Sequence, residues 1–244
     1  MSPLELQENW NVFPRGVLHV GAHEAEEAPM YEELAWAPVT WVEAQPALAE
    51  ALKARLETLN NRIIQAAIWN VSNVRLKLHI TSNSQSTSLL NLGTHSKSYP
   101  DVSVVNDIEV VTKRLDELIM EAEMPDFINI DIQGVEFQAL QSLGALITGI
   151  RYIYLEVNRK QVYEECATVR QIDKYLKNFG FTRASTRWYL LAGWGDALYL
   201  DRTAKPRTVM QKYRNTTAAT FFYYKQIPDI LKKPINVVRK RRKN

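Results

Sequence analysis

The chain has 244 residues, of which 46% are hydrophobic and 23% are charged, a composition that suits one α/β domain with a large core. Its single cysteine, Cys166, excludes an intrachain disulfide, a Cys-rich zinc site and a Cys-x-x-Cys redox site. Residues 232–244 hold seven Lys/Arg and no acid; the rest has 23 basic and 27 acidic residues, so the basic character belongs to the tail.

The N-terminal residues and the distribution of apolar stretches bear on the compartment. Residues 1–12 show no basic region followed by an apolar run, so we expect no signal peptide. No apolar stretch approaches the length of a membrane span. The expected location is therefore the cytoplasm.

Apolar runs alternate with helical patterns along the first half of the chain. Strands are predicted at 16–21, 39–43 and 62–68, and further β segments at 74–81 and 108–112, with a polar loop at 82–107. A short helix through Trp36 follows the first strand. Pro46 suits the first position of a second helix, which carries an apolar stripe of Leu48, Leu52, Leu56 and Leu59.

The second half continues the alternation. A helix is predicted at 115–124, a strand at 151–157, a helix at 168–178 that stops at Gly180, and β segments at 181–185 and 197–201. This order predicts an α/β fold with a mostly parallel sheet and helices on both faces. We expect one domain at 1–205, followed by a helical extension with a basic tail at 206–244.

The segment 125–143 is the most informative part of the chain. Phe127, Ile128, Ile130 and Ile132 form a nearly continuous apolar run, as in a strand that is covered on both faces. Gly134 marks a turn into an amphipathic helix. Asp131 is therefore predicted at the carboxyl end of a parallel strand, where open α/β sheets place ligands.

The loop after the first strand indicates which cofactor the sheet binds. It has one glycine, Gly21, followed by Glu24, Glu26 and Glu27, where a dinucleotide site needs a glycine-rich loop facing a pyrophosphate. Two like charges about 4 Å apart cost roughly 4 kcal/mol near a protein surface. A phosphate-free cofactor with a sulfonium avoids this repulsion, so S-adenosylmethionine is favoured over a nicotinamide. Glu43, which ends the second strand, is placed to accept hydrogen bonds from ribose.

Three motifs resemble those of the FkbM family of S-adenosylmethionine-dependent methyltransferases. They are Val20-Gly-Ala-His-Glu-Ala-Glu-Glu27, Trp41-Val-Glu-Ala-Gln-Pro46 and Phe127-Ile-Asn-Ile-Asp-Ile-Gln-Gly-Val-Glu136, and Tyr154-Leu-Glu-Val157 resembles the next strand. The resemblance covers residues 15–185. It implies a class I Rossmann-like methyltransferase fold, with seven strands of which the last is antiparallel, and O-methylation of a sugar, glycan or natural product. Ala25 stands where the family usually has a second glycine.

The resemblance also implies roles for individual residues. Gly21 would let the backbone approach the cofactor, Ala22 and His23 would flank its methionyl part, Glu43 would hold the ribose, and Ala67 and Ile68 would lie near the adenine. Asp131 would face the methyl group and the acceptor. It is the first candidate for the base that removes the acceptor proton, with His95, His23 and Glu156 behind it. Asp131 and Glu156 end neighbouring strands, but two carboxylates are too few to predict a metal.

Several residues also have structural interpretations. Asp131 could cap the following helix, Glu43 could be a surface carboxylate at a helix start, and Glu156 could pair with an arginine. His19, inside a strand, is expected to be a hydrogen-bonded core residue. Trp188 and Trp194 fit either a sugar-stacking rim or ordinary packing.

Three classes of function remain open. The leading one is O-methylation of a small-molecule or carbohydrate acceptor. A nucleic-acid methyltransferase is supported only by the tail, Arg239 to Lys243, and the acidic body argues against it. A non-catalytic binding module is suggested only by Ala25. The aromatic run Phe221 to Tyr224 needs an apolar partner, so a homo-oligomer or another surface contact through 221–244 is a further expectation.

Overall fold

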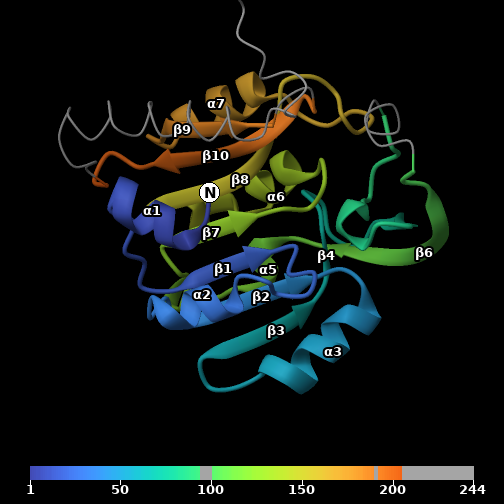
Figure 1. The fold of residues 1–244 in the computed structure, drawn as a ribbon, viewed down its shortest axis with the longest axis horizontal. Helices are drawn as coiled ribbons and strands as arrows, with labels where there is room; N and C mark the ends of the chain where they lie inside the picture. Colours follow the sequence, from blue (N-terminus) through green and yellow to red (C-terminus); the bar gives the residue numbers. More distant parts are fainter. Residues whose placement is uncertain (94–100, 190–191, 205–244) are drawn as a thin grey trace, which may run out of the picture. The chain divides into compact units, whose positions relative to one another are not determined.

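The computed structural model describes residues 1–93, 101–189 and 192–204. His95, the aromatic run at 221–224 and the basic tail, and with them the extension expected at 206–244, lie outside the described residues. The described part contains a seven-stranded sheet and a smaller three-stranded sheet (Figure 1). The strands of the larger sheet are β1 (Val17–Val20), β2 (Val39–Glu43), β3 (Asn61–Gln65), β7 (Phe127–Ile130), β8 (Tyr152–Asn158), β9 (Thr182–Trp188) and β10 (Trp194–Leu200).

The larger sheet has the strand order β3-β2-β1-β7-β8-β10-β9. The five strands from β3 to β8 are parallel, and β10 runs antiparallel to both β8 and β9. Every residue of the central strands β1 and β7 is buried, as their apolar runs predict for strands covered on both faces. The predicted class I Rossmann-like methyltransferase fold with a last antiparallel strand is confirmed.

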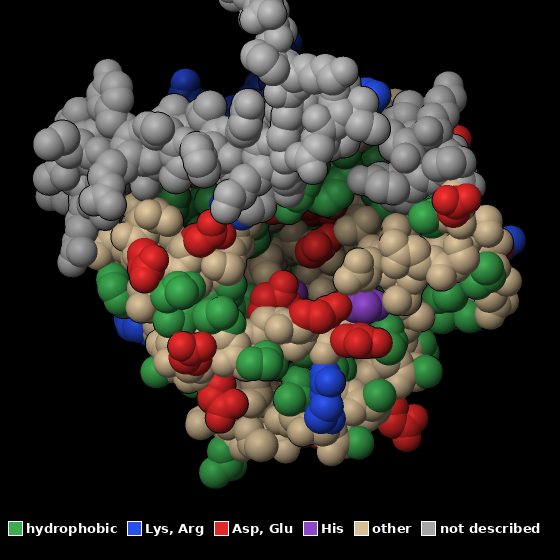
Figure 2. All heavy atoms as spheres, in the orientation of Figure 1, with side chains coloured by type: hydrophobic (Ala, Val, Ile, Leu, Met, Phe, Trp, Pro, Cys, Tyr) green, Lys and Arg blue, Asp and Glu red, His purple; other side chains and the backbone are tan. Residues whose placement is uncertain are grey.

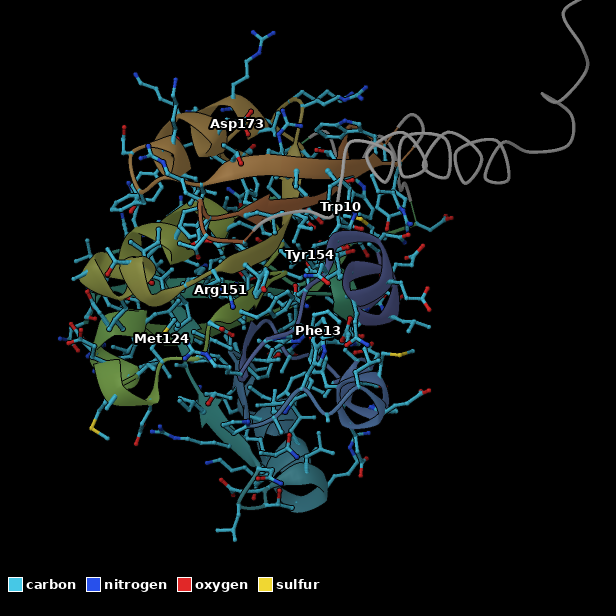
Figure 3. All side chains as sticks on the ribbon, turned by 90° about the vertical axis from the view of Figure 1, so that its left-hand side faces the viewer. Trp10, Phe13, Met124, Arg151, Tyr154 and Asp173 are labelled. Atoms are coloured by element: carbon cyan, nitrogen blue, oxygen red, sulfur yellow. The ribbon has the colours of Figure 1, made fainter. Side chains whose placement is uncertain are left out.

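Among the described residues, three α-helices lie on each face of this sheet. On one face lie α1 (Pro3–Trp10), α2 (Ala28–Glu33) and α3 (Pro46–Leu56), which share an apolar cluster that includes Trp10, Tyr31 and Leu52. On the other lie α5 (Leu115–Leu118), α6 (Glu136–Ser142) and α7 (Val169–Lys177), which share a second cluster. Figure 3 shows Trp10 of α1 beside the strand that carries Tyr154. No helix in the described ranges is long and apolar enough to cross a membrane.

The smaller sheet is made of β4 (Ala67–Ile68), β5 (Arg75–Thr81) and β6 (Val104–Lys113), in the order β4-β6-β5. The strand predicted at 62–68 is therefore two strands. The chain leaves the larger sheet at Ala66, whose N–H donates to the carbonyl of Glu43 at 2.9 Å, and β4 then pairs with β6. The small sheet and the short 3-10 helix η1 (Ser84–Ser86) thus lie next to the carboxyl end of β2.

The ends of other elements also differ from those predicted from the sequence. The helix predicted at 115–124 is one short turn, α5, because Ile119 is extended and buried; a 3-10 helix, η2 (Glu121–Glu123), follows it. Leu59 lies beyond the end of α3 and is fully exposed. Helix α1 was not predicted, although its capping box is visible in the sequence: Ser2 and Glu5 each accept a hydrogen bond from the other's backbone N–H.

Candidate active site

Two adjoining cavities open at the carboxyl edge of the parallel strands. Figure 2 shows a hollow on this face with carboxylate side chains gathered around it. The first cavity encloses about 580 Å³ of empty space, part of it open to solvent. Its walls come from the ends of β1, β2 and β7, from β4 and β5, and from η1: Val20, Gly21, His23, Val42, Glu43, Ala44, Gln45, Ala66, Ile68, Leu78, Ser84, Gln85, Thr87, Ser88, Leu89, Asp131, Ile132, Gln133 and Val135.

The second cavity is larger, with about 1170 Å³ of empty space on the same measure. It shares Gly21, His23, Gln85, Asp131 and Gln133 with the first cavity. Its other lining residues are mainly polar, acidic or aromatic: His19, Ala22, Glu26, Glu27, Asn83, Ser86, Glu156, Val162, Tyr163 and Trp194. The shared residues form the boundary across which a molecule in one cavity would meet a molecule in the other.

Gly21 follows β1 at this boundary and lies between the ends of β2 and β7. Its N–H donates to the carbonyl of Val42 at 2.9 Å, and the N–H of Asp131 donates to the carbonyl of Val20, also at 2.9 Å. Gly21 has a φ of +91°, and a Cβ at this position would lie 1.8 Å from the carbonyl oxygen of Asp131. Glycine is therefore required here because the backbone of Asp131 lies so close. Gly21 also lines both cavities.

Glu43 is a buried carboxylate held by two backbone amides. Its Oε2 accepts a hydrogen bond from the N–H of His23 and its Oε1 one from the N–H of Gln45, both at 2.8 Å. The residue is only 6% exposed, and this burial raises the pKa of its carboxyl group. A carboxylate can accept about four hydrogen bonds, so Glu43, which lines the first cavity, can accept further ones from a bound ligand.

His23 ties the loop after β1 to the small sheet. Its Nδ1 lies 2.8 Å from Oε1 of Glu26, and its Nε2 lies 2.8 Å from the hydroxyl of Ser84 in η1. Gln85 reaches the same Glu26 oxygen at 3.4 Å. These contacts connect the two segments that flank the cavities. His23 thus serves as a structural tie and also contributes to both cavity walls.

Ala25, where the resemblance expects glycine, has a left-handed backbone with a φ of +54°. Glycine adopts this conformation at little cost, whereas alanine is strained in it. The methyl group is buried, with 3% exposure, in the apolar cluster that α1, α2 and α3 share. The loop therefore keeps a backbone conformation typical of glycine although the residue is alanine. Burial of the alanine methyl group in the apolar cluster offsets part of the strain.

Gln133 stands between Asp131 and Glu156. Its Nε2 donates to Oδ1 of Asp131 at 2.6 Å and to Oε2 of Glu156 at 3.4 Å. Its Oε1 accepts a hydrogen bond from the hydroxyl of Tyr163 at 2.5 Å, and its backbone carbonyl accepts one from Ser88 at 2.6 Å. Gln133 therefore links the end of β7, β8 and the loops that follow β5 and β8.

The turn into α6 is capped by Glu136 and not by Asp131. Oε1 of Glu136 accepts hydrogen bonds from the N–H of Gly134 at 2.9 Å and of Ile132 at 3.3 Å. Burial raises the pKa of Glu136 to about 7. The carboxylate of Asp131 is exposed toward the cavities instead. The interpretation of Asp131 as a helix cap is therefore wrong.

The carboxyl groups of Asp131 and Glu156 lie in a negative environment. Although Asp131 is open to the cavities, the protein around it weakens the hydration of its carboxyl group and raises its pKa, and the charges of Asp196 and Glu27 act in the same direction. Burial raises the pKa of Glu156 well above its usual range, and the charges of Glu136 and Asp131 add to this effect. Within the described ranges, no three His, Cys, Asp or Glu side chains are grouped so that they could hold a metal ion.

The other predicted site residues are placed as follows. Ile68 lines the first cavity, but Ala67 does not; it packs with Leu78 and Val110, and Ala66 takes its place in the wall. Ala22 is buried beside the second cavity. Residues of the small sheet and of η1, such as Leu78 and Ser84, were missed because no local pattern in the sequence brings them to the strand ends.

His19 has the core environment expected for it. Its Nδ1 lies 3.2 Å from the hydroxyl of Tyr31, and its ring stacks on Trp41 with a centroid distance of 4.8 Å. Burial lowers the pKa of His19 to about 4, so the ring is neutral near pH 7. Of the two tryptophans, Trp194 lines the second cavity, whereas the ring of Trp188 carries the Arg159 guanidinium above it at 4.1 Å.

Two loops pack against each other beside the second cavity, which Val162 and Tyr163 line. Leu90 and Leu92, which follow β5, pack against a small buried cluster of Val162, Tyr163 and Cys166. The contact is close, because a Cβ on Gly93 would lie 2.9 Å from the carbonyl oxygen of Val162. Tyr163 of this cluster also reaches Gln133, so the cluster that joins the loops is connected to the boundary between the cavities.

Comparisons with known proteins agree with this architecture. The model of the FkbM methyltransferase domain matches residues 19–182. The 2-O-methyltransferase NoeI of Sinorhizobium fredii is 26% identical over 174 residues, which cover 67% of this chain and 71% of that protein.

Solved structures similar to this chain include a putative tRNA methyltransferase of Streptococcus pneumoniae, with a TM-score of 0.45, 12% identity and coverage of 94% of this chain and 90% of that one. Magnesium protoporphyrin IX methyltransferase of Synechocystis, solved with its bound cofactor, has a TM-score of 0.40, 12% identity and coverage of 76% and 69%. The family match spans the ends of β1, β2, β7 and β8, on which the cavities are built. The chain belongs to the FkbM methyltransferase family, and it is an enzyme whose methyl donor is S-adenosylmethionine.

Proposed function

We propose that this enzyme methylates a hydroxyl group of a sugar, glycan or natural product. The observation that carries the proposal is the meeting of the two cavities at Asp131 and Gln133. A cofactor in the first cavity and an acceptor in the second would meet beside a carboxylate. The similar protein NoeI is a 2-O-methyltransferase, which supports oxygen as the atom that is methylated.

The residues of the cavities fit S-adenosylmethionine. The first cavity combines apolar walls, including Val42, Ile68 and Leu78, with the buried carboxylate of Glu43. Apolar walls suit an adenine ring, and a carboxylate with free lone pairs suits ribose hydroxyls. The carboxylates of the second cavity suit a ligand with positive charge. We therefore assign the nucleoside part to the first cavity and the donor side to the boundary with the second.

S-adenosylmethionine supplies a methyl group made electrophilic by the sulfonium. We assign to Asp131 the removal of the proton from the acceptor hydroxyl, as the bond between methyl carbon and acceptor oxygen forms and the bond between carbon and sulfur breaks. Gln133 holds one oxygen of Asp131 at 2.6 Å. The other oxygen stays available to the acceptor. Alignment of the reacting groups supplies much of the remaining rate enhancement.

The lining of the second cavity favours an acceptor without phosphate. Glu26, Glu27, Asp131 and Glu156 lie in its wall, and no Lys or Arg from the described part of the chain does. Nucleic-acid binding depends on contacts between cationic side chains and phosphates. Tyr163 and Trp194 offer aromatic surface of the kind on which sugar rings pack. An uncharged polyhydroxylated acceptor is therefore preferred over a nucleic acid.

The proposal is tested by binding and then by turnover. We expect S-adenosylhomocysteine to bind in calorimetric titrations and NAD not to bind. Release of S-adenosylhomocysteine from S-adenosylmethionine is then measured over a panel of sugars, glycans and hydroxylated natural products, with RNA as the comparison. Methylation of RNA alone would contradict the proposal, as would cofactor binding with no transfer to any hydroxyl acceptor.

Replacing Glu43 with glutamine should weaken binding of S-adenosylhomocysteine by about 10- to 100-fold. The reason is the loss of a charge-assisted hydrogen bond, worth about 1.5–3 kcal/mol. Calorimetric titration measures the effect. Glu50→Gln, at an exposed position of α3, is the matched control and should bind like the wild type. Equal affinities for all three proteins would show that Glu43 does not hold the ribose.

A further inference from the structure

The amide of Gln133 occupies an unusual position among carboxyl groups. It donates to Asp131 at 2.6 Å and to Glu156 at 3.4 Å, and the side chain of Glu156 is 6% exposed. Among the described residues, neither carboxylate forms an ion pair with a Lys, Arg or His side chain. The NH₂ group of Gln133, which is the positive end of the amide dipole, therefore faces the carboxyl groups of both Asp131 and Glu156.

The orientation of this amide is determined by its neighbours. The hydroxyl of Tyr163 donates to Oε1 at 2.5 Å, and burial raises the pKa of Tyr163, so the hydroxyl keeps its proton. A flipped amide would turn its oxygen toward two carboxyl groups and its NH₂ toward a donor. The backbone is held as well, because Ser88 donates to the Gln133 carbonyl at 2.6 Å and the residue has a left-handed φ of +54°.

The groups around Asp131 are otherwise acidic on every side. They come from the loop after β1, from the neighbouring strands, from α6 and from the loop after β8: Glu26, Glu27, Asp196, Glu156, Glu136 and Tyr163, with His23 as the one basic group in the shared wall. Such surroundings favour the protonated carboxylic acid. A base must nevertheless be ionised to accept a proton from the acceptor.

We propose that Gln133 is a positioning residue that keeps Asp131 ionised and directed into the cavities, while Glu156 retains a proton. The shorter of its two hydrogen bonds goes to Asp131 and favours the ionised form of that group. Glu156 is the more buried of the two and accepts only long hydrogen bonds, from Gln133 and from Asn158 at 3.4 Å each, so it is the group that stays neutral. The pair then carries one negative charge. This inference rests on the proposed function of Asp131.

Binding of two cofactor forms at several pH values tests the inference without an acceptor. S-adenosylmethionine and S-adenosylhomocysteine differ by a methyl group and a positive charge, so the ratio of their affinities reports negative charge beside the sulfur. In the wild type, the preference for the charged form should grow as pH rises from 5 to 8.5. In Gln133→Leu, the midpoint of this change should move up by about one pH unit, with the affinity for S-adenosylhomocysteine kept within about threefold.

A second variant and a control show whether a shift of the midpoint is specific to the amide of Gln133. Gln133→Glu preserves the side-chain volume but brings a carboxylate where an amide donated, and it should raise the midpoint at least as far. Gln65→Leu removes an exposed amide that donates to the Ala44 carbonyl at 3.2 Å, and it should leave the midpoint unchanged.

Three results would overturn the inference: a wild-type ratio that does not vary with pH, a midpoint that stays within about 0.3 units in both variants, or an equal loss of affinity for the two cofactor forms. Failure of the proposed function looks different. In that case the wild type would bind the cofactor and its midpoint would shift as expected, but no hydroxyl acceptor would be methylated.

Discussion

Asp131→Asn is expected to lower the rate of methyl transfer by about 10²- to 10⁴-fold, the usual contribution of a general base. Asparagine keeps the shape of the side chain and can still accept the hydrogen bond from Gln133, but it cannot take a proton. Because the backbone of Asp131 already joins β1 to β7 through its N–H, the substitution leaves the boundary of the cavities in place. Turnover of an acceptor that the wild type methylates reports the loss of the base, and calorimetric titration of S-adenosylhomocysteine shows whether cofactor binding is kept.

The same substitution should stabilise the fold at pH 8. The pKa of Asp131 is higher in the folded chain than in the unfolded one, so stability falls as pH rises through this interval. A neutral side chain removes that loss. Asp101→Asn, an exposed aspartate away from both cavities, serves as the control for turnover and for Tm. Full activity in Asp131→Asn would move the search for the base to His23, Glu156 and His95.

Gly21→Ala is expected to destabilise the protein by about 2–6 kcal/mol, the combined range for a strained backbone and for overpacking. The new Cβ would lie 1.8 Å from the backbone oxygen of Asp131, and a side chain is strained at a φ of +91°. Either β1 and β7 separate or the turn after β1 changes shape. Both changes disturb the place where the cavities meet, so cofactor binding should be lost together with stability.

Urea unfolding measures this effect, and Gly149→Ala provides the control. A Cβ at Gly149 meets no atom within 4 Å, so that variant should unfold at the wild-type urea concentration or above. An unchanged midpoint for Gly21→Ala would mean that the contact between Gly21 and Asp131 is looser than the structure shows. A stable Gly21→Ala that fails to bind S-adenosylhomocysteine would instead give Gly21 a direct role in binding.

The larger sheet was predictable because its central strands are covered on both faces. The apolar runs at 39–43 and 127–130 correspond to β2 and β7. The break at Ala66 was not predictable, since it depends on pairing between Ala67 and Thr112, which are distant in the sequence. Helix α1 could have been found, because proline at its first turn and the Ser2–Glu5 capping box are local signals.

In the candidate site, too, some features were predictable from the sequence and others were not. Gly21, Glu43, Asp131 and Glu156 were predicted from their places at strand ends, and the parallel sheet brings them to one edge. The link that Gln133 makes between two of them was not predicted, because it requires Tyr163 to come from another loop. Ala67 does not line the first cavity, because the chain turns away from β2 at Ala66 and pairs with β6.

The cluster of Leu90, Leu92, Val162, Tyr163 and Cys166 has a consequence for how this enzyme can diverge. These residues belong to loops after β5 and β8, whereas Glu43 and Gly21 belong to the ends of β2 and β1. If the second cavity holds the acceptor as proposed, mutations around this cluster can change which acceptor is recognised without touching Gly21 or Glu43. Because the loops pack on each other, substitutions in one create selection for matching changes in the other. Acceptor preference in descendants of this chain should then evolve through paired changes at 90–93 and 159–167.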